Sequence, residues 1–464
     1  MKKRTRKLWG GRFTQSTAKV VERFSHSFLV DSRLARYDLL GSIAHARMLG
    51  RSGIIPLTDS RRLVRVLTEM LKEFERGRLK LDSSAEDVHT AIQVALERRA
   101  GTTAGRLHAA RSRNDQVVTD LRLYCIDKVR ELQEAITGLQ RQILIRAKKD
   151  QNRIIPGCTH LRHAQPVLAA HLFLSYVAML ERDGDRLQGV LQRTDELPLG
   201  SGALTGTGLP INRSMVAKEL GFSRVCENSI DGVSDRDFVA EFLSAISLLG
   251  IHLARISEDL ILWSTPEFGF LRFNEMMLTG SSMMPQKQNP DFLELTRAGA
   301  ARIIGNQTAF LTLLKGLPTG YQRDLQLDKE ILFEALDRIE PMLEVLTRGF
   351  VGIRWNPKAV EVQLSDESLY ATDLAEYLVK KGVPFSQAHR AVGRLLSYVD
   401  RTGVKLKSLP LQTFHRFSPV FGKEVHRLID PAFSISGKRS IGSTHPRFVA
   451  RSIRQWDRRL QGRR

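Results

Sequence analysis

Residues 280–290, Gly-Ser-Ser-Met-Met-Pro-Gln-Lys-Gln-Asn-Pro, combine two adjacent hydroxyls with a lysine and a side-chain amide. The glycine and the two prolines predict a loop rather than a helix or strand. The hydroxyls of Ser281 and Ser282 can move a proton, while Lys287 and Asn289 can stabilise negative charge. Such a loop suits proton removal beside a carboxylate. The alternative is a surface connection with incidental polar residues. The other polar segments of the chain must distinguish between these two interpretations.

A second polar segment, Arg-Ser-Arg-Asn-Asp at residues 111–115, opens the clearest helical pattern of the chain. Ser112 and Asp115 have the spacing of a capping box, which predicts a well-capped helix start. Free backbone N–H groups at that start, beside Arg113 and Asn114, also suit an anion such as a carboxylate. Both interpretations stay open on the sequence.

Residues 159–166, Thr-His-Leu-Arg-His-Ala-Gln-Pro, place two histidines directly before an apolar segment. His160 and His163 could bind a metal, but no local carboxylates or thiolates accompany them, so no metal site is expected. A histidine that titrates near neutral pH is a natural proton carrier, although a structural role is the commoner case.

Two further connections contain unusual residues. Residues 200–208 are rich in glycine but lack the Gly-Lys-Ser/Thr ending of a phosphate loop, so they predict a tight turn near a ligand. Within residues 320–330, Arg323, Gln326 and Lys329 are spaced three apart and would share one helix face. That face either contacts a ligand or is solvated.

Long helices must position these loops. Apolar residues recur at steps of three or four from Val118 to Ile143, which predicts one helix over residues 114–149. At 1.5 Å per residue it would span about 54 Å, a length that is typical of an extended helical bundle. Such a bundle can form a core that is shared between subunits. Strand-type alternation is scarce. Further helices are predicted over residues 34–49, 63–74, 86–99, 167–180, 237–263, 291–314 and 330–350.

These patterns predict an all-α protein with three helical domains. The first covers residues 1–110, and the second is a central long-helix bundle over residues 111–359. After residue 355 the helices shorten and turn signals increase, which predicts a C-terminal helical domain over residues 360–464.

The composition describes an ordinary globular protein, with 42% hydrophobic and 26% charged residues in a chain of 464. No uninterrupted apolar run approaches the ~20 residues needed to cross a bilayer, and the basic N-terminus lacks the apolar stretch of a secretory signal. The three cysteines lie far apart, which fits neither a disulfide framework nor a zinc site. We therefore expect a cytoplasmic protein with no membrane partner.

The formal net charge of +21 is partly concentrated at the two ends. Residues 1–7 contain five Lys/Arg and no acid, and residues 451–464 contain six Arg and one acid, so each end supplies +5. We interpret both ends as solvated basic tails. The chain contains no recognisable nucleic-acid-binding motif, so specific nucleic-acid recognition is not expected.

Taken together, the polar loops resemble the sequence motifs of a known enzyme superfamily. Residues 280–290 resemble the signature loop of the fumarase/aspartase superfamily, helical homotetramers of which most eliminate fumarate from a succinyl group. Within that superfamily, the chain is similar to the argininosuccinate lyase family. The motifs that carry this similarity are residues 9–13, 86–90, 111–122, 159–166, 199–204, 285–287 and 371–377.

The resemblance implies an all-α homotetramer, with each active site assembled from three subunits, that needs no cofactor and no metal. It implies reversible cleavage of argininosuccinate into arginine and fumarate, the last step of arginine biosynthesis. By likeness, Ser281 removes the proton, and Lys287 with Asn289 stabilises the aci-carboxylate carbanion. His160, supported by Glu294, assists protonation of the leaving nitrogen, a role that another group could also fill.

The resemblance also implies a set of substrate contacts. They are Ser27, Asp87, Ser112, Arg113, Asn114, Thr159, Arg236, Tyr321, Gln326 and Lys329. An alcohol is a poor base, so backbone amides of residues 280–284 would have to lower the pKa of Ser281 when the loop closes. Some positions depart from the family pattern without removing an assigned group: Gln93, Arg162, His163, Thr205, Gln288, Gln322 and Leu327. Two alternatives stay open: another succinyl-cleaving lyase of the superfamily, and an inactive crystallin-like structural relative.

Overall fold

A computed structural model describes residues 14–462, and the motif predicted at residues 9–13 lies outside this range. Within the described residues the regular secondary structure is mostly helical, and six short strands form three two-stranded sheets. The all-α prediction is therefore confirmed. The described residues form two compact units, and the division into three domains stays a prediction.

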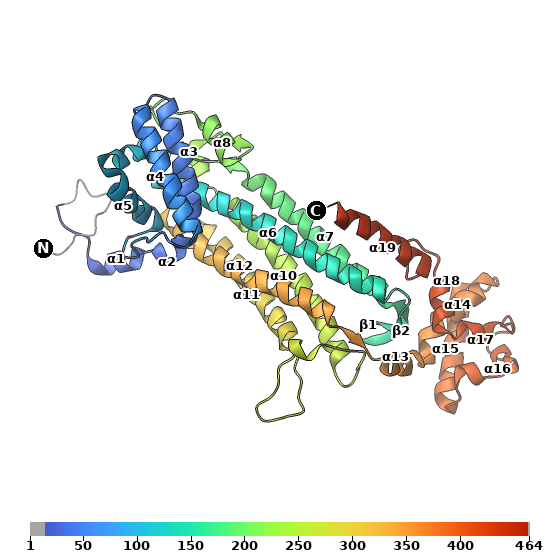
Figure 1. The fold of residues 1–464 in the computed structure, drawn as a ribbon. Helices are drawn as coiled ribbons and strands as arrows, with labels where there is room; N and C mark the ends of the chain where they lie inside the picture. Colours follow the sequence, from blue (N-terminus) through green and yellow to red (C-terminus); the bar gives the residue numbers. More distant parts are fainter. Residues whose placement is uncertain (1–13, 463–464) are drawn as a thin grey trace. The chain divides into compact units, whose positions relative to one another are not determined.

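Unit 1 comprises residues 14–133, 184–248 and 301–339. Its shorter elements are α1 (Lys19–Ser25), α2 (Phe28–Asp31), α3 (Ala35–Arg51), α4 (Leu57–Glu75), α5 (Val88–Ala100), β3 (Glu196–Leu197), α8 (Arg213–Leu220), β4 (Arg224–Val225) and α9 (Ser229–Ser234). Helices α3 and α4 lie side by side (Figure 1). They approach closely at Gly50, where an added Cβ would meet the side chain of Ser60 at 2.4 Å.

Unit 2 comprises residues 134–183, 249–300 and 340–462. Its shorter elements are β1 (Ile154–Thr159), β2 (Arg162–Leu168), β5 (Leu271–Arg272), β6 (Arg354–Trp355), α13 (Pro357–Leu364), α14 (Ala371–Lys380), α15 (Phe385–Thr402), α16 (Leu411–His415), α17 (Val425–Leu428), α18 (Pro431–Gly437) and α19 (Pro446–Gln461). Residues 369–429 form a hydrophobic cluster of their own, which includes Tyr377, Phe414 and Phe421.

Five long helices contribute residues to these units: α6 (Arg113–Lys149), α7 (Ala169–Thr194), α10 (Asp237–Ser264), α11 (Asp291–Leu314) and α12 (Asp328–Val351). Their periodic apolar residues predicted them within a few residues, apart from α7. Helix α12 continues across Pro341. Helix α10 is long and apolar enough to cross a membrane by length and composition, but most of its apolar window is buried inside the protein, as in the core helix of a soluble protein.

Polar contacts fix the antiparallel packing of these helices within each unit. In unit 1, Arg122 of α6 donates to the carbonyl of Thr194 at 3.0 Å, and Gln133, eleven residues on, donates to the carbonyl of Gly184. In unit 2, the Tyr176 hydroxyl of α7 donates to Asp259 of α10 at 2.7 Å. Since these polar groups are largely shielded from water, their pairing specifies the register of the helices.

The hairpin β1–β2 was not predicted, and a helix from residue 167 was expected instead. Ile155 pairs with Val167 and Pro156 with Pro166, and α7 begins only at Ala169 and runs to Thr194. The two-residue turn consists of His160 and Leu161, whose φ angles of 55° and 57° lie in the left-handed region. Such a turn normally uses Asn-Gly or a similar pair, so the sequence carried no hairpin signal.

The prediction of a solvated tail at residues 451–464 is also wrong for the residues of this segment that the structure describes. Residues 446–461 form α19, which buries Val449, Ile453 and Leu460. The three apolar residues are spaced by four and seven on a strongly basic background, so they lie on one face of the helix, and their burial by tertiary packing stabilises it.

The hairpin requires glycine at position 157. An added Cβ there would lie 2.6 Å from the carbonyl oxygen of Gln165 on the paired strand. We expect Gly157→Ala to lower the free energy of unfolding by roughly 1–3 kcal/mol, because the strands must separate. Gly138→Ala in α6 is the control: a Cβ there meets nothing within 4 Å, so the change should stabilise by roughly 0.5–1 kcal/mol. Equal effects in urea unfolding would contradict this account.

Candidate active site

Unit 1 contains a polar cavity of about 340 Å³, a size that suits a small-molecule ligand. Its walls come from the start of α2, the start of α5, the start of α6 and the segment before α12. The lining residues are Ser27, Asp31, Glu86, Asp87, His89, Thr90, His108, Arg113, Asn114, Gln116, Val117, Tyr321, Arg323, Gln326 and Lys329. Seven of the ten predicted substrate contacts therefore meet in one pocket.

The first turn of α6 is organised by the buried carboxylate of Asp115. One oxygen accepts the backbone N–H of Ser112 at 2.9 Å, as the capping-box spacing predicted, and Asn114 N–H donates to the Ser112 hydroxyl at 3.2 Å. The other oxygen accepts the N–H groups of Gly200 and Gly202, both at 2.9 Å. Burial raises the pKa of Asp115 to about 6 against the opposing effect of these hydrogen bonds. The carboxylate thus joins the helix start to the glycine-rich turn.

Arg113 projects from this turn into the pocket wall. Its guanidinium lies 3.2 Å from the Asp87 carboxylate and donates to Gln116 Oε1 at 3.1 Å and to Thr90 Oγ1 at 3.3 Å. Burial would raise the pKa of Asp87, but the charges of Arg113 and His89 and the hydrogen bonds from Thr90 together outweigh it, and the pKa lies below its ordinary value. The pair therefore presents a fixed positive and a fixed negative group to the cavity.

Lys329 is the buried cation of the opposite wall. Its Nζ lies 2.8 Å from Asp328 and 3.9 Å from Asp31, whose carboxylate also accepts a short hydrogen bond from Ser27. Burial alone would lower the pKa of Lys329, but the carboxylates outweigh burial and raise it. Arg236 donates to Asp328 at 2.6 Å and does not line the cavity. It therefore supports the carboxylate that holds Lys329.

The short 3-10 helix Arg323–Leu327 closes one side of the pocket. Arg323 pairs with Glu86 at 2.9 Å and donates to the carbonyl of Ser25 at 3.1 Å, and Gln326 donates to the same carbonyl at 3.4 Å. Burial raises the pKa of the neighbouring Tyr321 hydroxyl. These side chains face the pocket rather than forming only a solvated helix face.

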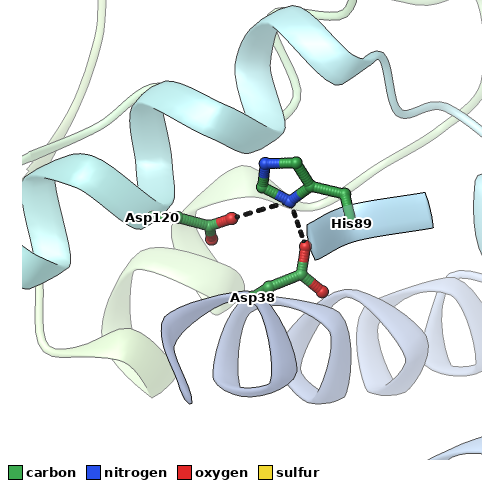
Figure 2. A group of neighbouring side chains, drawn as sticks. All are labelled: Asp38, His89 and Asp120. Carbon is green, nitrogen blue, oxygen red and sulfur yellow. Dashed lines mark hydrogen bonds and ion pairs between the residues drawn. The ribbon is translucent and has the colours of Figure 1, made fainter. Parts of the chain in front are cut away.

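Behind the pocket, Asp38, His89 and Asp120 form a fully buried cluster (Figure 2). His89 Nδ1 lies 2.5 Å from Asp38 Oδ2 and 3.5 Å from Asp120 Oδ2, and Gln116 Nε2 donates to Asp38 at 2.5 Å. Burial would raise the pKa of Asp38, but the hydrogen bond and charge of His89, together with the positive charges of Arg111 and Arg113, outweigh it and lower the pKa to about 2. Burial, together with the charge of Asp38, raises the pKa of Asp120 well above its ordinary value. The two carboxyl groups of the cluster therefore differ in acidity, and Asp38 is the more readily ionised of the two.

The spacing of these three groups would also suit a metal ion, since their ligand atoms lie within 4.8 Å of one another. However, Asp38 already accepts from His89 and Gln116, and the positive charge of Arg111 acts on both carboxyl groups. These partners satisfy the hydrogen-bonding requirement of the Asp38 carboxylate, whereas Asp120 Oδ2 and His89 Nε2 are buried without a hydrogen-bonding partner among the described residues. We assign the cluster as a hydrogen-bonded network that supports Gln116 and, through it, Arg113.

Thr159 and His160 belong to unit 2, at the hairpin turn, where they line a different cavity of about 980 Å³. The left-handed backbone of His160 belongs, with that of Leu161, to the two-residue turn of the hairpin. Among residues 14–462, the His160 ring has no hydrogen-bonding partner, whereas His163 pairs with Asp366 at 2.7 Å. Of the two histidines, His160 is the one available for proton transfer.

The loop at residues 280–290 also belongs to unit 2. Thr279 and Asn289 exchange two backbone hydrogen bonds of 2.9 and 3.0 Å, which close its base. The Ser281 hydroxyl oxygen accepts the backbone N–H groups of Met283 at 3.3 Å and Met284 at 3.1 Å. Lys287 is exposed. Backbone amides of this loop are the groups that would have to lower the pKa of Ser281 if it acts as a base.

Several predicted residues do not line the pocket of unit 1. Ser112 acts in the helix cap, Arg236 lies behind Asp328, and Thr159 lines the cavity of unit 2. The catalytic residues predicted from the resemblance, which are Ser281, His160, Lys287, Asn289 and Glu294, all lie in unit 2. Within residues 14–462 no hydrogen bond or ion pair joins His160 to Glu294, so their pairing stays a prediction.

The sequence also missed pocket residues. His89, Thr90 and Gln116 lie beside assigned residues, in the segments 86–90 and 111–122, so wider use of those motifs would have found them. Asp31 lies four residues after Ser27 on the same helical turn, a spacing that brings the two side chains together.

Comparisons with known proteins identify the fold. Residues 11–305 match a family model described as a lyase. Among solved structures, EDDS lyase in complex with formate has a TM-score of 0.83 at 24% identity, covering 97% of this chain and 91% of that one. Class II fumarase from Schistosoma mansoni has a TM-score of 0.75 at 16% identity, covering 89% and 92%. The fold and the matched model together place the chain among the lyases with the fumarase/aspartase fold.

Closer relatives define the family. Argininosuccinate lyase from Symbiobacterium thermophilum is 45% identical over 96% of this chain and 97% of the relative. Argininosuccinate lyase from Syntrophus aciditrophicus is 46% identical over 97% of this chain and 95% of the relative. Residues 368–436 match the model of the argininosuccinate lyase C-terminal region. The chain belongs to the argininosuccinate lyase family.

The two carboxyl groups of the buried cluster should respond differently to substitution. Asp38→Asn removes the ionised group that faces His89 and Gln116, and we expect it to lower the free energy of unfolding by roughly 3–5 kcal/mol. Asp120→Asn replaces the less acidic carboxyl group with a neutral amide of similar shape and should cost less than about 1 kcal/mol. Urea unfolding at pH 7 and fixed protein concentration measures both. A larger loss for Asp120→Asn would reverse the assigned order of acidity.

Proposed function

We propose that this chain catalyses the reversible elimination of fumarate from argininosuccinate, which leaves arginine, as the last step of arginine biosynthesis in the cytoplasm. The observation that carries the proposal is the gathering of seven expected substrate contacts in the unit 1 pocket, in a chain about 45% identical to relatives named argininosuccinate lyase. The three cysteines, all free, are in line with a reducing compartment.

The pocket has the mixed charge that this substrate requires. Argininosuccinate carries carboxylates and a guanidinium group, and the cavity offers cations at Arg113 and Lys329 and anions at Asp31 and Asp87. Guanidinium–carboxylate pairs form charge-assisted, directional hydrogen bonds, which orient a ligand as well as bind it. Because each charge in the wall already has a partner, substrate binding exchanges partners instead of leaving a buried charge unpaired.

Ser281 acts as the general base in this proposal. Its oxygen accepts two backbone amides, and such donors favour the alkoxide over the alcohol. The alkoxide takes the proton on the carbon next to the succinyl carboxylate, and an aci-carboxylate carbanion forms. Lys287 and Asn289 stabilise its added negative charge, which is the main energetic requirement because a C–H beside a carboxylate is very weakly acidic.

Cleavage of the C–N bond then needs a proton on the leaving nitrogen. We assign this role to His160, supported by Glu294, with the exposed and unpaired ring of His160 as the supporting geometry. The carbanion electrons form the double bond of fumarate, and arginine leaves with the transferred proton.

The complete site is assembled from three subunits of a homotetramer in this proposal. Helix α11 exposes Ile304 and Leu311, at 40% and 51%, with the spacing of seven that places them on one face. Exposed apolar residues on one side of a long helix favour packing against another subunit. The same helix carries Glu294 in its first turn, directly after the loop at residues 280–290.

Turnover tests the proposal directly. Argininosuccinate and adenylosuccinate are supplied separately, and fumarate is followed by its ultraviolet absorbance. We expect fumarate only from argininosuccinate. Turnover of adenylosuccinate alone would establish a different succinyl-cleaving lyase, and no turnover of either would favour a structural relative without activity.

Ser281→Ala tests the general base. We expect kcat to fall by roughly 10²–10⁴-fold, the range for loss of a positioned base, with the oligomeric state unchanged by size-exclusion chromatography. The matched control is Ser282→Ala, which removes the same atom from an exposed neighbour and should cost less than about tenfold. If Ser282→Ala is the more damaging variant, Ser281 is not the base.

A further inference from the structure

Helix α19 carries a line of arginines on its exposed face. Arg447, Arg451, Arg454 and Arg458 are all exposed and follow one another at spacings of four, three and four. Side chains at these spacings lie on the same side of an α-helix. We call these four residues the basic stripe. It spans about 16.5 Å at 1.5 Å per residue.

The opposite side of α19 is fully used in packing within unit 2. Val449, Ile453 and Leu460 are buried, and Arg141 of α6 donates to the Leu460 carbonyl at 3.1 Å. Lys148 of α6 pairs with Asp457 at 2.6 Å. The helix is therefore held in place without any contribution from the basic stripe.

No acid neutralises the basic stripe within residues 14–462. The one acid of α19, Asp457, is engaged with Lys148, and Arg459 turns away to Glu181 at 3.4 Å. Like charges three or four residues apart destabilise a helix by a few tenths of a kcal/mol per pair. The stripe therefore carries a repulsion that an anionic partner would relieve.

We propose that the basic stripe binds the phosphodiester backbone of a nucleic acid without reading its base sequence. A duplex carries one phosphate charge per strand for every 3.4 Å of its axis, so a nucleic acid offers regularly repeated negative charge over the whole length of the stripe. Arginine is the residue best suited to phosphate oxygens, because its planar guanidinium donates two hydrogen bonds in parallel. The repeated charge of the stripe matches the repeated charge of the polymer.

Two other anionic partners fit the stripe less well. A membrane surface would bind α19 through its apolar face, but that face is already buried against unit 2. An acidic protein surface seldom presents evenly spaced charges along a line of this length, whereas a phosphodiester chain does so by its covalent structure. Binding at the stripe goes beyond the proposed lyase activity and does not depend on it.

Fluorescence anisotropy with a labelled 20-nucleotide single strand of mixed sequence tests the proposal. Four phosphate contacts predict a slope of about −2.8 in log K against log [salt], a loss of about 50-fold in affinity between 50 and 200 mM salt. Arg447→Gln, Arg451→Gln, Arg454→Gln and Arg458→Gln together should reduce the slope by about 3. A scrambled sequence of equal length should bind equally well.

The control removes the same formal charge elsewhere. Arg51, Arg61, Arg62 and Arg65, on α3 and α4, are also exposed, and their replacement with Gln should change the slope by less than 1. Equal losses for both variants would show that net charge, not the stripe, binds the polymer. Absence of wild-type binding at 50 mM salt, or tighter stripe-dependent binding to anionic lipid vesicles, would overturn the proposal. Circular dichroism confirms that both variants are folded.

Discussion

The buried carboxylate of Asp115 is the interaction on which the pocket depends. Its two oxygens accept three backbone N–H groups, one from the start of α6 and two from the turn at Gly200 and Gly202. The first residues of a helix leave N–H groups without internal partners, and a carboxylate in the first turn satisfies them. Because the same group also binds the turn, Asn114 is brought within 3.0 Å of the Ala203 carbonyl. The carboxylate of Asp115 thus both caps α6 and positions the glycine-rich turn beside it.

The pocket keeps charged groups buried by giving each of them a partner. Lys329 shares Asp328 with Arg236, and Arg113 is held by Asp87 and, through Gln116, by the cluster around Asp38. A buried ion pair contributes little net stability, but loss of one member is costly because the other is left unpaired. This arrangement fits a binding site, where the orientation of charges matters more than the stability that they add. It also explains why the residues behind the pocket lining, Asp328, Arg236 and Asp38, are polar as well.

The periodic patterns of the sequence were sufficient for most of the helices and for part of the site. The long helices α6, α10, α11 and α12 were predicted within a few residues because their apolar spacing is a local property. The cap at Ser112 and Asp115 could be predicted because the spacing of a capping box is also a local property. The residues predicted for the pocket came from the resemblance, and seven of them line one cavity. Their roles in catalysis stay predictions.

Only the tertiary structure decided the remaining features, because each depends on residues far apart in the chain or on backbone angles that the residue types do not favour. The hairpin at residues 154–168 has His160 and Leu161 at its turn, where a sequence signal would need glycine or asparagine. The C-terminal residues form a helix whose Val449, Ile453 and Leu460 are buried, and Arg141 of α6 donates to the Leu460 carbonyl across more than 300 positions. The partnership of Asp38 with His89 joins residues 51 positions apart, and Arg236 reaches Asp328 across 92. The sequence alone determined most of the long helices, the cap of α6 and, by resemblance, the family; packing decided which charged groups meet and which are left exposed.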